Sequence, residues 1–129
     1  MNIYQGSGWN LSINEAWHHE ESDGVITISN PEGYGALQVS SYLKDSPVVV
    51  NDLKDLASEH IEAGAKVTFS EINGNQSLTL AFGKDGNFWQ EWYVAIGNRA
   101  LYITYNCSEL DIEHEIGIVK TMVASLKAT

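Results

Sequence analysis

Apolar and polar residues alternate along most of residues 66–106, and glycine-containing turns separate the alternating runs. Such alternation is typical of strands, because successive side chains of a strand point to opposite faces. Asn73-Gly74 is a strong signal for a two-residue hairpin turn, and it places Phe69 opposite Leu78. The same register pairs other residues of like character: Ser70 with Ser77, Thr68 with Thr79 and Val67 with Leu80.

Two further turns extend this hairpin. Gly83-Lys84-Asp85-Gly86-Asn87, taken as a five-residue loop, predicts these pairs: Phe82 with Phe88, Leu78 with Trp92, and Ala81 with Trp89. Gly97-Asn98, taken as a two-residue turn, predicts another set: Val94 with Leu101, Trp92 with Ile103, Tyr93 with Tyr102, and Glu91 with Thr104. A one-residue slip moves a whole strand's apolar set to the other face, so the agreement predicts a four-stranded meander over 66–106.

The rest of the chain is expected to form hairpins and two helices. Asp23-Gly24 predicts a turn between strands over 17–21 and 25–29, and residues 35–43 predict a further strand with Leu37 and Val39 pointing inward. Apolar residues at helical spacing predict helices over about 50–63, capped by Asn51 or Asp52 and ended by Gly64, and over about 111–127. We therefore expect one α+β domain over 1–129, with a twisted antiparallel sheet packed against the two helices.

The predicted register gives the meander two different faces. One face is interpreted as core and carries Phe69, Phe82, Trp92 and Tyr105. The other combines small polar or apolar residues with large aromatics: Thr68, Ser70, Ser77, Thr79, Ala81, Trp89, Glu91, Tyr93, Tyr102 and Thr104. Either this face is exposed and contacts a partner, or a helix or the segment with Ile3, Tyr4 and Trp9 covers it. The candidate partner-binding residues are Trp89, Glu91, Tyr93, Tyr102 and Thr104.

Charge and cysteine content restrict the classes of partner. Seventeen acidic residues against seven basic ones give a formal charge of −10, which disfavours nucleic-acid binding. The negative field suits a basic protein partner, although it also serves solubility. One cysteine, Cys107, rules out an intramolecular disulfide. Residues 1–10 lack a signal-peptide pattern, and no apolar run is long enough for a membrane span, so a cytoplasmic location is expected.

Motifs that carry chemistry are weak in this sequence. His18-His19-Glu20-Glu21 lies on a predicted strand, where only alternate side chains share a face, so it supplies two ligands and no zinc site. His114-Glu115 begins like a zinc-protease motif but lacks the second histidine four residues later. His60 is interpreted as a partly buried histidine with a partner, and Cys107 as a spectator thiol. We expect no catalytic residues, metal or cofactor.

The order of elements resembles a known α/β/α fold. The resemblance covers about residues 9–126 and is carried by Trp9-Asn10-Leu11, Glu15-Ala16-Trp17, Gly35-Ala36-Leu37-Gln38-Val39-Ser40, Trp89 to Trp92, and Asn98 to Asn106. This pattern is similar to the fold shared by the photosystem extrinsic protein PsbP, a Ran-binding nuclear import factor, and small bacterial adaptor and immunity-like proteins. The resemblance implies a binding role without catalytic residues and assigns no site residue.

Two functional hypotheses follow from the sequence. The first is a non-enzymatic protein-interaction module, such as a bacterial adaptor or immunity-type protein, that uses the acidic surface and the aromatic face; a homodimer is one form of it. The second is a small hydrolase or ligand-binding domain with a pocket at the sheet edge. A broad aromatic face favours the first hypothesis, and a pocket with converging polar groups favours the second.

Overall fold

The computed structural model describes residues 2–129. Over these residues the chain forms ten strands, three α-helices and one short 3-10 helix. In chain order they are β1 (Asn2–Gln5), β2 (Trp9–Ile13), β3 (His18–Ser22), β4 (Val25–Ser29), β5 (Ala36–Leu43), α1 (Val50–Leu56), α2 (Ser58–Glu62), β6 (Val67–Ile72), β7 (Asn75–Lys84), β8 (Asn87–Ile96), β9 (Arg99–Ser108), η1 (Glu109–Asp111), α3 (Ile112–Ala124) and β10 (Lys127–Ala128).

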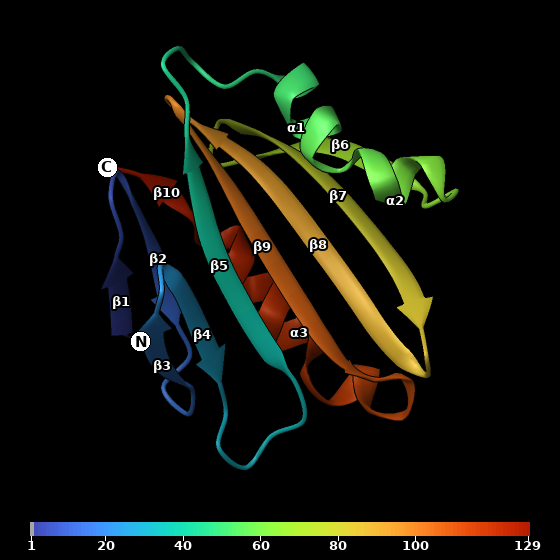
Figure 1. Cartoon of the computed structure of the whole chain (residues 1–129). Coiled ribbons are helices and arrows are strands. Elements are labelled where there is room, and N and C mark those ends of the chain that lie inside the picture. The colour runs from blue at the N-terminus through green and yellow to red at the C-terminus, as the bar shows by residue number, and fades with distance from the viewer. Residues whose placement is uncertain (1) are drawn as a thin grey trace.

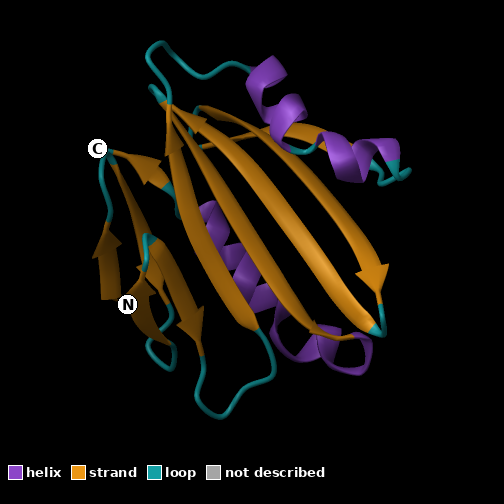
Figure 2. Ribbon diagram, viewed as in Figure 1, coloured by secondary structure: helices purple, strands orange, loops and turns teal. Residues whose placement is uncertain are grey.

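A twisted seven-stranded antiparallel sheet forms the centre of the fold, with the strand order β3-β4-β5-β9-β8-β7-β6. Helix α3 lies behind this sheet, whereas α1 and α2 lie in front of one end of it (Figures 1 and 2). A second sheet, β1-β2-β10, packs its buried residues into the same core as α3. The α+β class and the antiparallel sheet expected from the sequence are confirmed.

The meander and most of its register agree with the sequence prediction. Strands β6 and β7 pair Phe69 with Leu78 around Asn73-Gly74, and β8 and β9 pair Tyr93 with Tyr102 around Gly97-Asn98. The upstream hairpin β3–β4 and strand β5 are also present, and Leu37 and Val39 on β5 are fully buried. Trp92 and Tyr93 therefore lie on opposite faces, as predicted.

The predicted pairing between β7 and β8 is wrong by one residue. The turn contains only Asp85 and Gly86, which adopt φ values of 54° and 80°, so Lys84 already pairs with Asn87. A two-residue turn of this kind favours Asp-Gly, because both positions require positive φ. The observed partners replace the expected ones: Phe82 with Trp89, Ala81 with Gln90, Leu78 with Tyr93, and Thr79 with Trp92.

This shift changes the composition of both faces. The α1/α2 side of the sheet holds a cluster with Leu78, Leu80, Tyr93 and, at its margin, Phe82. The α3 side holds Trp92 in the larger core, together with Trp9, Leu11, Ile13, Leu101, Ile103, Tyr105, Val119 and Met122. Phe69 and Phe82 are therefore not core partners of Trp92, and Phe69 is 52% exposed. The N-terminal strands cover the α3 side and not the aromatic face.

The first predicted helix is divided at Ala57. Residues 50–56 and 58–62 form α1 and α2, and the fully buried Ala57 between them has φ −92° and ψ 4°. Alanine is the best helix former, so local propensity does not explain the break, and Ala57 packs in a cluster with Leu78 and Tyr93 of the sheet. Asp52 is at the third helical position, where it accepts the N–H of Val49 at 2.9 Å; it is not the N-cap residue. Gly64 follows α2 with φ 94°, as expected for a helix end.

The second predicted helix is shorter than 111–127. It ends at Ala124, and Lys127 belongs to β10, where it pairs with Asn10 of β2. Ser125 directs the chain there, because its hydroxyl oxygen accepts the N–H of Ser12 at 2.9 Å. The amide of Asn73, from the β6–β7 turn, donates to the carbonyl oxygens at 124 and 126 and so satisfies the end of the helix.

Candidate functional site

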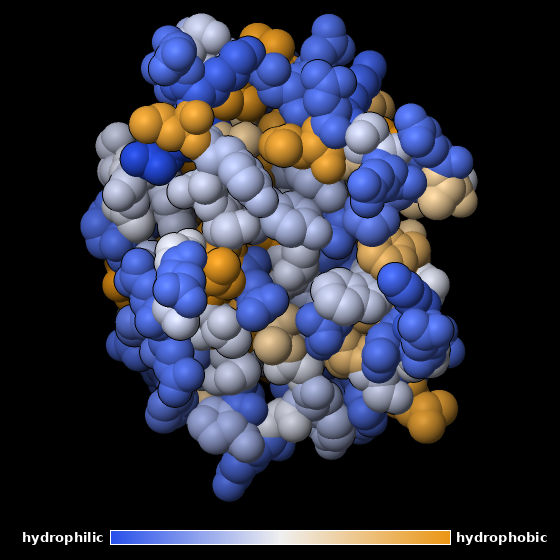
Figure 3. Space-filling view, in the orientation of Figure 1, coloured by the Kyte–Doolittle hydropathy of each residue, from blue (hydrophilic) through white to orange (hydrophobic). Residues whose placement is uncertain are grey.

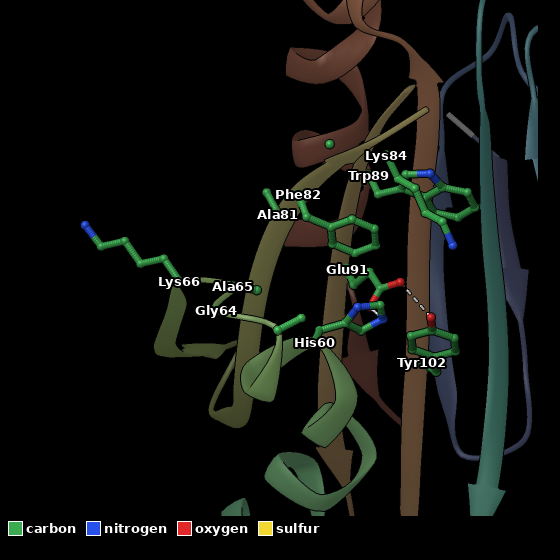
Figure 4. Close-up of a pocket in the computed structure, with 12 residues that line it drawn as sticks. His60, Gly64, Ala65, Lys66, Ala81, Phe82, Lys84, Trp89, Glu91 and Tyr102 are labelled. Atoms are coloured by element: carbon green, nitrogen blue, oxygen red, sulfur yellow. Dashed lines mark hydrogen bonds and ion pairs between the residues drawn. The ribbon is translucent and has the colours of Figure 1, made fainter. Parts of the chain in front are cut away.

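A pocket of about 700 Å³ opens between α2 and the sheet (Figure 4). Its lining comes from α2, from the turn after it (63–66), from 81–84 on β7, and from β8 and β9. The side chains that define its chemistry are His60, Phe82, Trp89, Glu91 and Tyr102. We call this cavity the Glu91 pocket.

Glu91 lies at the floor of the pocket and is only 2% exposed. Its Oε1 accepts a hydrogen bond from the hydroxyl of Tyr93 at 2.7 Å, and its Oε2 accepts one from the hydroxyl of Tyr102, also at 2.7 Å. The Nε2 atom of His60 lies 3.2 Å from Oε1. Figure 4 shows the His60 and Tyr102 side chains directed toward the carboxylate from different elements. Glu91 is therefore a buried acid with three polar neighbours.

Aromatic rings form the pocket wall above Glu91. The rings of His60 and Phe82 stack with centroids 4.5 Å apart and an angle of 22° between their planes. Phe82 and Trp89, which face each other across β7 and β8, have nearly parallel rings at 6.1 Å. The observed β7–β8 register creates this wall, because it places both aromatic residues on the α1/α2 side.

Two smaller hollows adjoin the Glu91 pocket on the side of α1 and share lining residues with it or with each other. A second hollow of about 190 Å³ shares His60 and Tyr102 with the Glu91 pocket and adds Tyr42 and Leu56. A third, of about 300 Å³, shares Tyr42 and Leu56 and adds Leu43. Tyr42 is 51% exposed, Leu56 43% and Leu43 71%. Figure 3 shows apolar surface beside a hollow on this side of the molecule. We call the three adjoining hollows the α1/α2 groove.

The five residues predicted to bind a partner differ in exposure. Trp89 and Tyr102 are partly exposed and line the Glu91 pocket. Glu91, Tyr93 and Thr104 are buried, at 2%, 2% and 6% exposure, so Tyr93 lacks the exposure that the exposed-face alternative requires. Helix α1 and the break after it contribute to this burial, because Leu53 of α1 and Ala57 share a cluster with Tyr93. This face is therefore partly covered, and of the five predicted residues only Trp89 and Tyr102 stay partly exposed.

Sequence reasoning missed two members of the site. Phe82 was assigned to the opposite face through the register error. His60 was correctly expected to be partly buried and to have a partner, but its partner, Glu91, was not identified. The contact joins a helix to a strand about thirty residues further along the chain, and no turn or periodicity in the sequence specifies it.

The phenols around the carboxylate stay protonated well above neutral pH. Burial, and then the hydrogen bond to Glu91, raise the pKa of both Tyr93 and Tyr102 above the usual value for a phenol. On the α3 side, burial also raises the pKa of the Cys107 thiol, and this side chain is only 4% exposed. Neither the tyrosines nor the thiol is thus activated for proton abstraction or nucleophilic attack at neutral pH.

The other candidate chemical groups lie outside the Glu91 pocket. All residues of His18–Ser22 are exposed on an edge strand, and residues 2–129 hold no group of three metal-ligating side chains. Glu115 is 4% exposed and its carboxylate accepts hydrogen bonds from the N–H groups of Tyr34 and Gly35 and from the Tyr105 hydroxyl.

No helix in the described part of the chain is long and apolar enough to span a membrane.

Comparisons with known proteins establish the fold. No family model matches the sequence, and a search of curated protein sequences gives no match. The chain is similar to the solution structure of cyanobacterial PsbP (CyanoP) from Synechocystis, with a TM-score of 0.71 and 11% identity over 99% of this chain and 92% of that one. A crystal structure from Bacteroides thetaiotaomicron matches with a TM-score of 0.68 and 16% identity. The match covers 95% of this chain but only 45% of the Bacteroides chain. The protein thus has a PsbP-like fold.

Proposed function

We propose that this chain is a non-enzymatic binding module that holds a partner protein in the α1/α2 groove. The observation that carries this proposal is the row of adjoining hollows from the Glu91 pocket to the exposed side chains of Tyr42, Leu43 and Leu56. Exposed apolar side chains gathered beside a concavity are typical of protein contact surfaces. An adaptor or immunity role in a bacterium is the form of this function that we propose.

The chemistry of the pocket supports binding more than catalysis. Both carboxylate oxygens of Glu91 already accept hydrogen bonds from tyrosine hydroxyls, whose pKa values are raised by burial and by Glu91. A general base needs access to the proton that it abstracts, and a nucleophile needs an activating base. Glu91 is engaged and Cys107 is buried on the other side of the sheet. The pocket is therefore best suited to hold a ligand.

A small-molecule ligand is the second candidate. The Glu91 pocket, at about 700 Å³, is within the size range of small-molecule sites. Its aromatic wall and buried carboxylate also fit a planar ligand with a hydrogen-bond donor. The extension past Tyr42 to Leu43 favours a polypeptide, because a small molecule in the pocket leaves that exposed apolar surface uncovered.

Truncation of Trp89 tests the proposal. Tagged wild-type chain, Trp89→Ala and Ile118→Ala are used to recover proteins from the native organism, and the recovered partner is then purified and titrated against each variant. Ile118 is a partly exposed apolar residue on α3, behind the sheet, and serves as the matched control. We expect Trp89→Ala to weaken binding by about 2 kcal/mol, because large aromatic anchors carry most contact energy. Ile118→Ala should bind like the wild type.

Stability measurements separate a binding defect from unfolding. Trp89→Ala should lower the free energy of unfolding by about 1 kcal/mol. Trp92→Ala, in the core on the α3 side, should lower it by about 3–5 kcal/mol because it leaves a cavity. Equal loss of stability in the two variants, or unchanged partner binding by a folded Trp89→Ala, contradicts the proposal. A dimer of the isolated chain that Trp89→Ala dissociates identifies the partner as a second copy.

A further inference from the structure

The buried carboxylate of Glu91 has no permanent counter-charge. Its only ion-pair partner among the described residues is His60, whose side chain is 33% exposed at the pocket wall. The two tyrosine hydroxyls are neutral donors. A buried carboxylate without a fixed cation is costly, and a cation brought by a ligand offsets that cost.

The hydrogen bonds to Glu91 do not use the whole acceptor capacity of its carboxylate. An ionised carboxylate offers about four acceptor positions. The Tyr93 and Tyr102 hydroxyls fill two of them at 2.7 Å, and the Nε2 atom of His60 lies 3.2 Å from Oε1 as an ion-pair contact. The carboxylate therefore keeps acceptor capacity at a pocket that it lines.

The wall of the pocket suits a flat cation. His60, Phe82 and Trp89 present stacked rings beside the carboxylate, and a guanidinium group stacks on aromatic faces more readily than an ammonium does. The groove beyond the pocket also carries acidic side chains: Glu59 and Asp55 line its next two hollows, where Asp52 is paired with Lys44 at 2.9 Å. This negative charge is complementary to a basic segment, and the chain as a whole also has a net charge of −10.

Two lysines also line the pocket, but they do not fill the cation position. Lys66 extends away from the other labelled side chains in Figure 4, and Lys84 runs beside Trp89 near the rim. Neither ammonium forms an ion pair with Glu91 in the described structure. The positive charge of Lys84 at the entrance opposes a cationic ligand, so its removal should strengthen the binding of such a ligand.

We infer that the Glu91 pocket binds an arginine side chain of a basic partner segment. The guanidinium group donates to Glu91 and stacks against the wall formed by His60, Phe82 and Trp89. Apolar residues of the same segment then lie along Tyr42, Leu43 and Leu56. This inference rests on the proposed function and assigns the chemical class of the partner.

A pair of small probes tests the inference. N-acetyl-L-arginine amide and its neutral isostere N-acetyl-L-citrulline amide are titrated at about millimolar concentration against the labelled full chain, and the indole N–H signals are followed by NMR. The Trp89 signal is assigned by its absence in Trp89→Phe. The indoles of Trp9, Trp17 and Trp92 lie in the α3-side core and serve as internal controls. We expect the arginine probe alone to shift the Trp89 signal.

Three variants identify the cause of the binding. Glu91→Gln, which removes the charge and keeps the shape, should weaken the arginine probe by about tenfold. Asp23→Asn removes one negative charge from the β3–β4 turn, which joins strands three and four positions away from β8 in the sheet, and should leave binding unchanged. Asparagine tolerates the positive φ of 51° at this position. Lys84→Met should strengthen the arginine probe by about two- to threefold.

The outcomes distinguish this inference from the proposed function. Equal binding of arginine and citrulline probes, arginine binding that Glu91→Gln leaves unchanged, or no shift of the Trp89 indole overturns the arginine assignment. If Glu91→Gln unfolds, the comparison of the two probes on the wild-type chain still tests the arginine assignment. If the arginine and citrulline probes do not differ but Trp89→Ala still fails to bind the partner, only the arginine assignment is refuted. The proposed binding function then stands. Retention of the partner by Trp89→Ala refutes the function itself.

Discussion

Glu91 and Glu115 are the two buried carboxylates of the described chain, and they lie on opposite sides of the sheet. Each accepts a hydrogen bond from a tyrosine of β9, Tyr102 for the first and Tyr105 for the second. Their other neighbours differ. Glu115 also accepts two backbone N–H groups, whereas Glu91 borders open space and a titratable side chain. Glu115 therefore holds the loop before β5 in place, whereas Glu91 lines the pocket for which we propose a ligand.

Replacement of Glu115 tests its structural role. Its carboxylate holds the loop before β5, where Gly35 approaches β9 so closely that a Cβ would lie 2.2 Å from the carbonyl oxygen of Asn106. Glu115→Gln replaces one acceptor oxygen by a donor, and a buried donor then loses its partner. We expect the free energy of unfolding, measured by urea denaturation, to fall by about 1–3 kcal/mol.

The neighbouring Glu113 supplies the control for this measurement. It is exposed on the same helix, so Glu113→Gln removes the same charge without a buried hydrogen bond. Its effect should stay within about 0.5 kcal/mol. Equal effects of the two substitutions would show that charge, and not the hydrogen bonds to the loop, sets the contribution of Glu115.

At the level of the elements, the sequence determined the hairpins whose turn length was clear. The Asn73-Gly74 and Gly97-Asn98 turns gave the correct registers. The β7–β8 connection contains two glycines, and it admits a five-residue loop as well as the observed two-residue turn. Strand β8 is buried on both faces from Glu91 to Ile96, so polar alternation does not choose between the registers.

The register error and the packing of α2 together explain why the candidate site was only partly predicted. Trp89, Glu91 and Tyr102 were assigned to one face correctly, because the β8–β9 register was right. Phe82 was placed on the wrong face. His60 reaches Glu91 through the packing of α2 on the sheet, after a break at Ala57 that has no local sequence signal. Turn chemistry thus predicts neighbours across strands, but it does not predict which helix residue closes a pocket.

At the scale of the whole molecule, the sheet separates two cores. The α3 side contains the larger cluster and the small β1-β2-β10 sheet, whereas the α1/α2 side contains a smaller cluster and the groove. Both cores include tyrosines that donate to a buried carboxylate, which links folding on each side to the protonation of these phenols.

Alkaline pH should therefore destabilise the fold. Burial first, and then hydrogen bonds to Glu91 or Glu115, raise the pKa of Tyr93, Tyr102 and Tyr105. A group with a raised folded-state pKa contributes full stability below its unfolded pKa, here about 10, and loses that contribution as pH rises above it. We expect the urea midpoint to fall between about pH 10 and 12.

Tyr102→Phe gives the control for this pH dependence, because it removes one of the three phenols and leaves the lysines unchanged. The decline of the urea midpoint with pH should be less steep in this variant. Phenolate absorbance of the buried tyrosines should appear only together with loss of the native circular dichroism signal. A midpoint that is constant from about pH 9 to 11, or an identical slope in Tyr102→Phe, contradicts the linkage.

Hydrogen exchange of the chain alone and in complex with its recovered partner tests the central claim most directly, because it locates the partner on the surface. Binding in the α1/α2 groove predicts slower exchange in α1, α2 and the turn that follows, at 63–66, and near Trp89 on β8, with α3 and β1 unchanged. Slower exchange confined to α3 or to the β1-β2-β10 sheet would place the partner behind the main sheet and contradict the account.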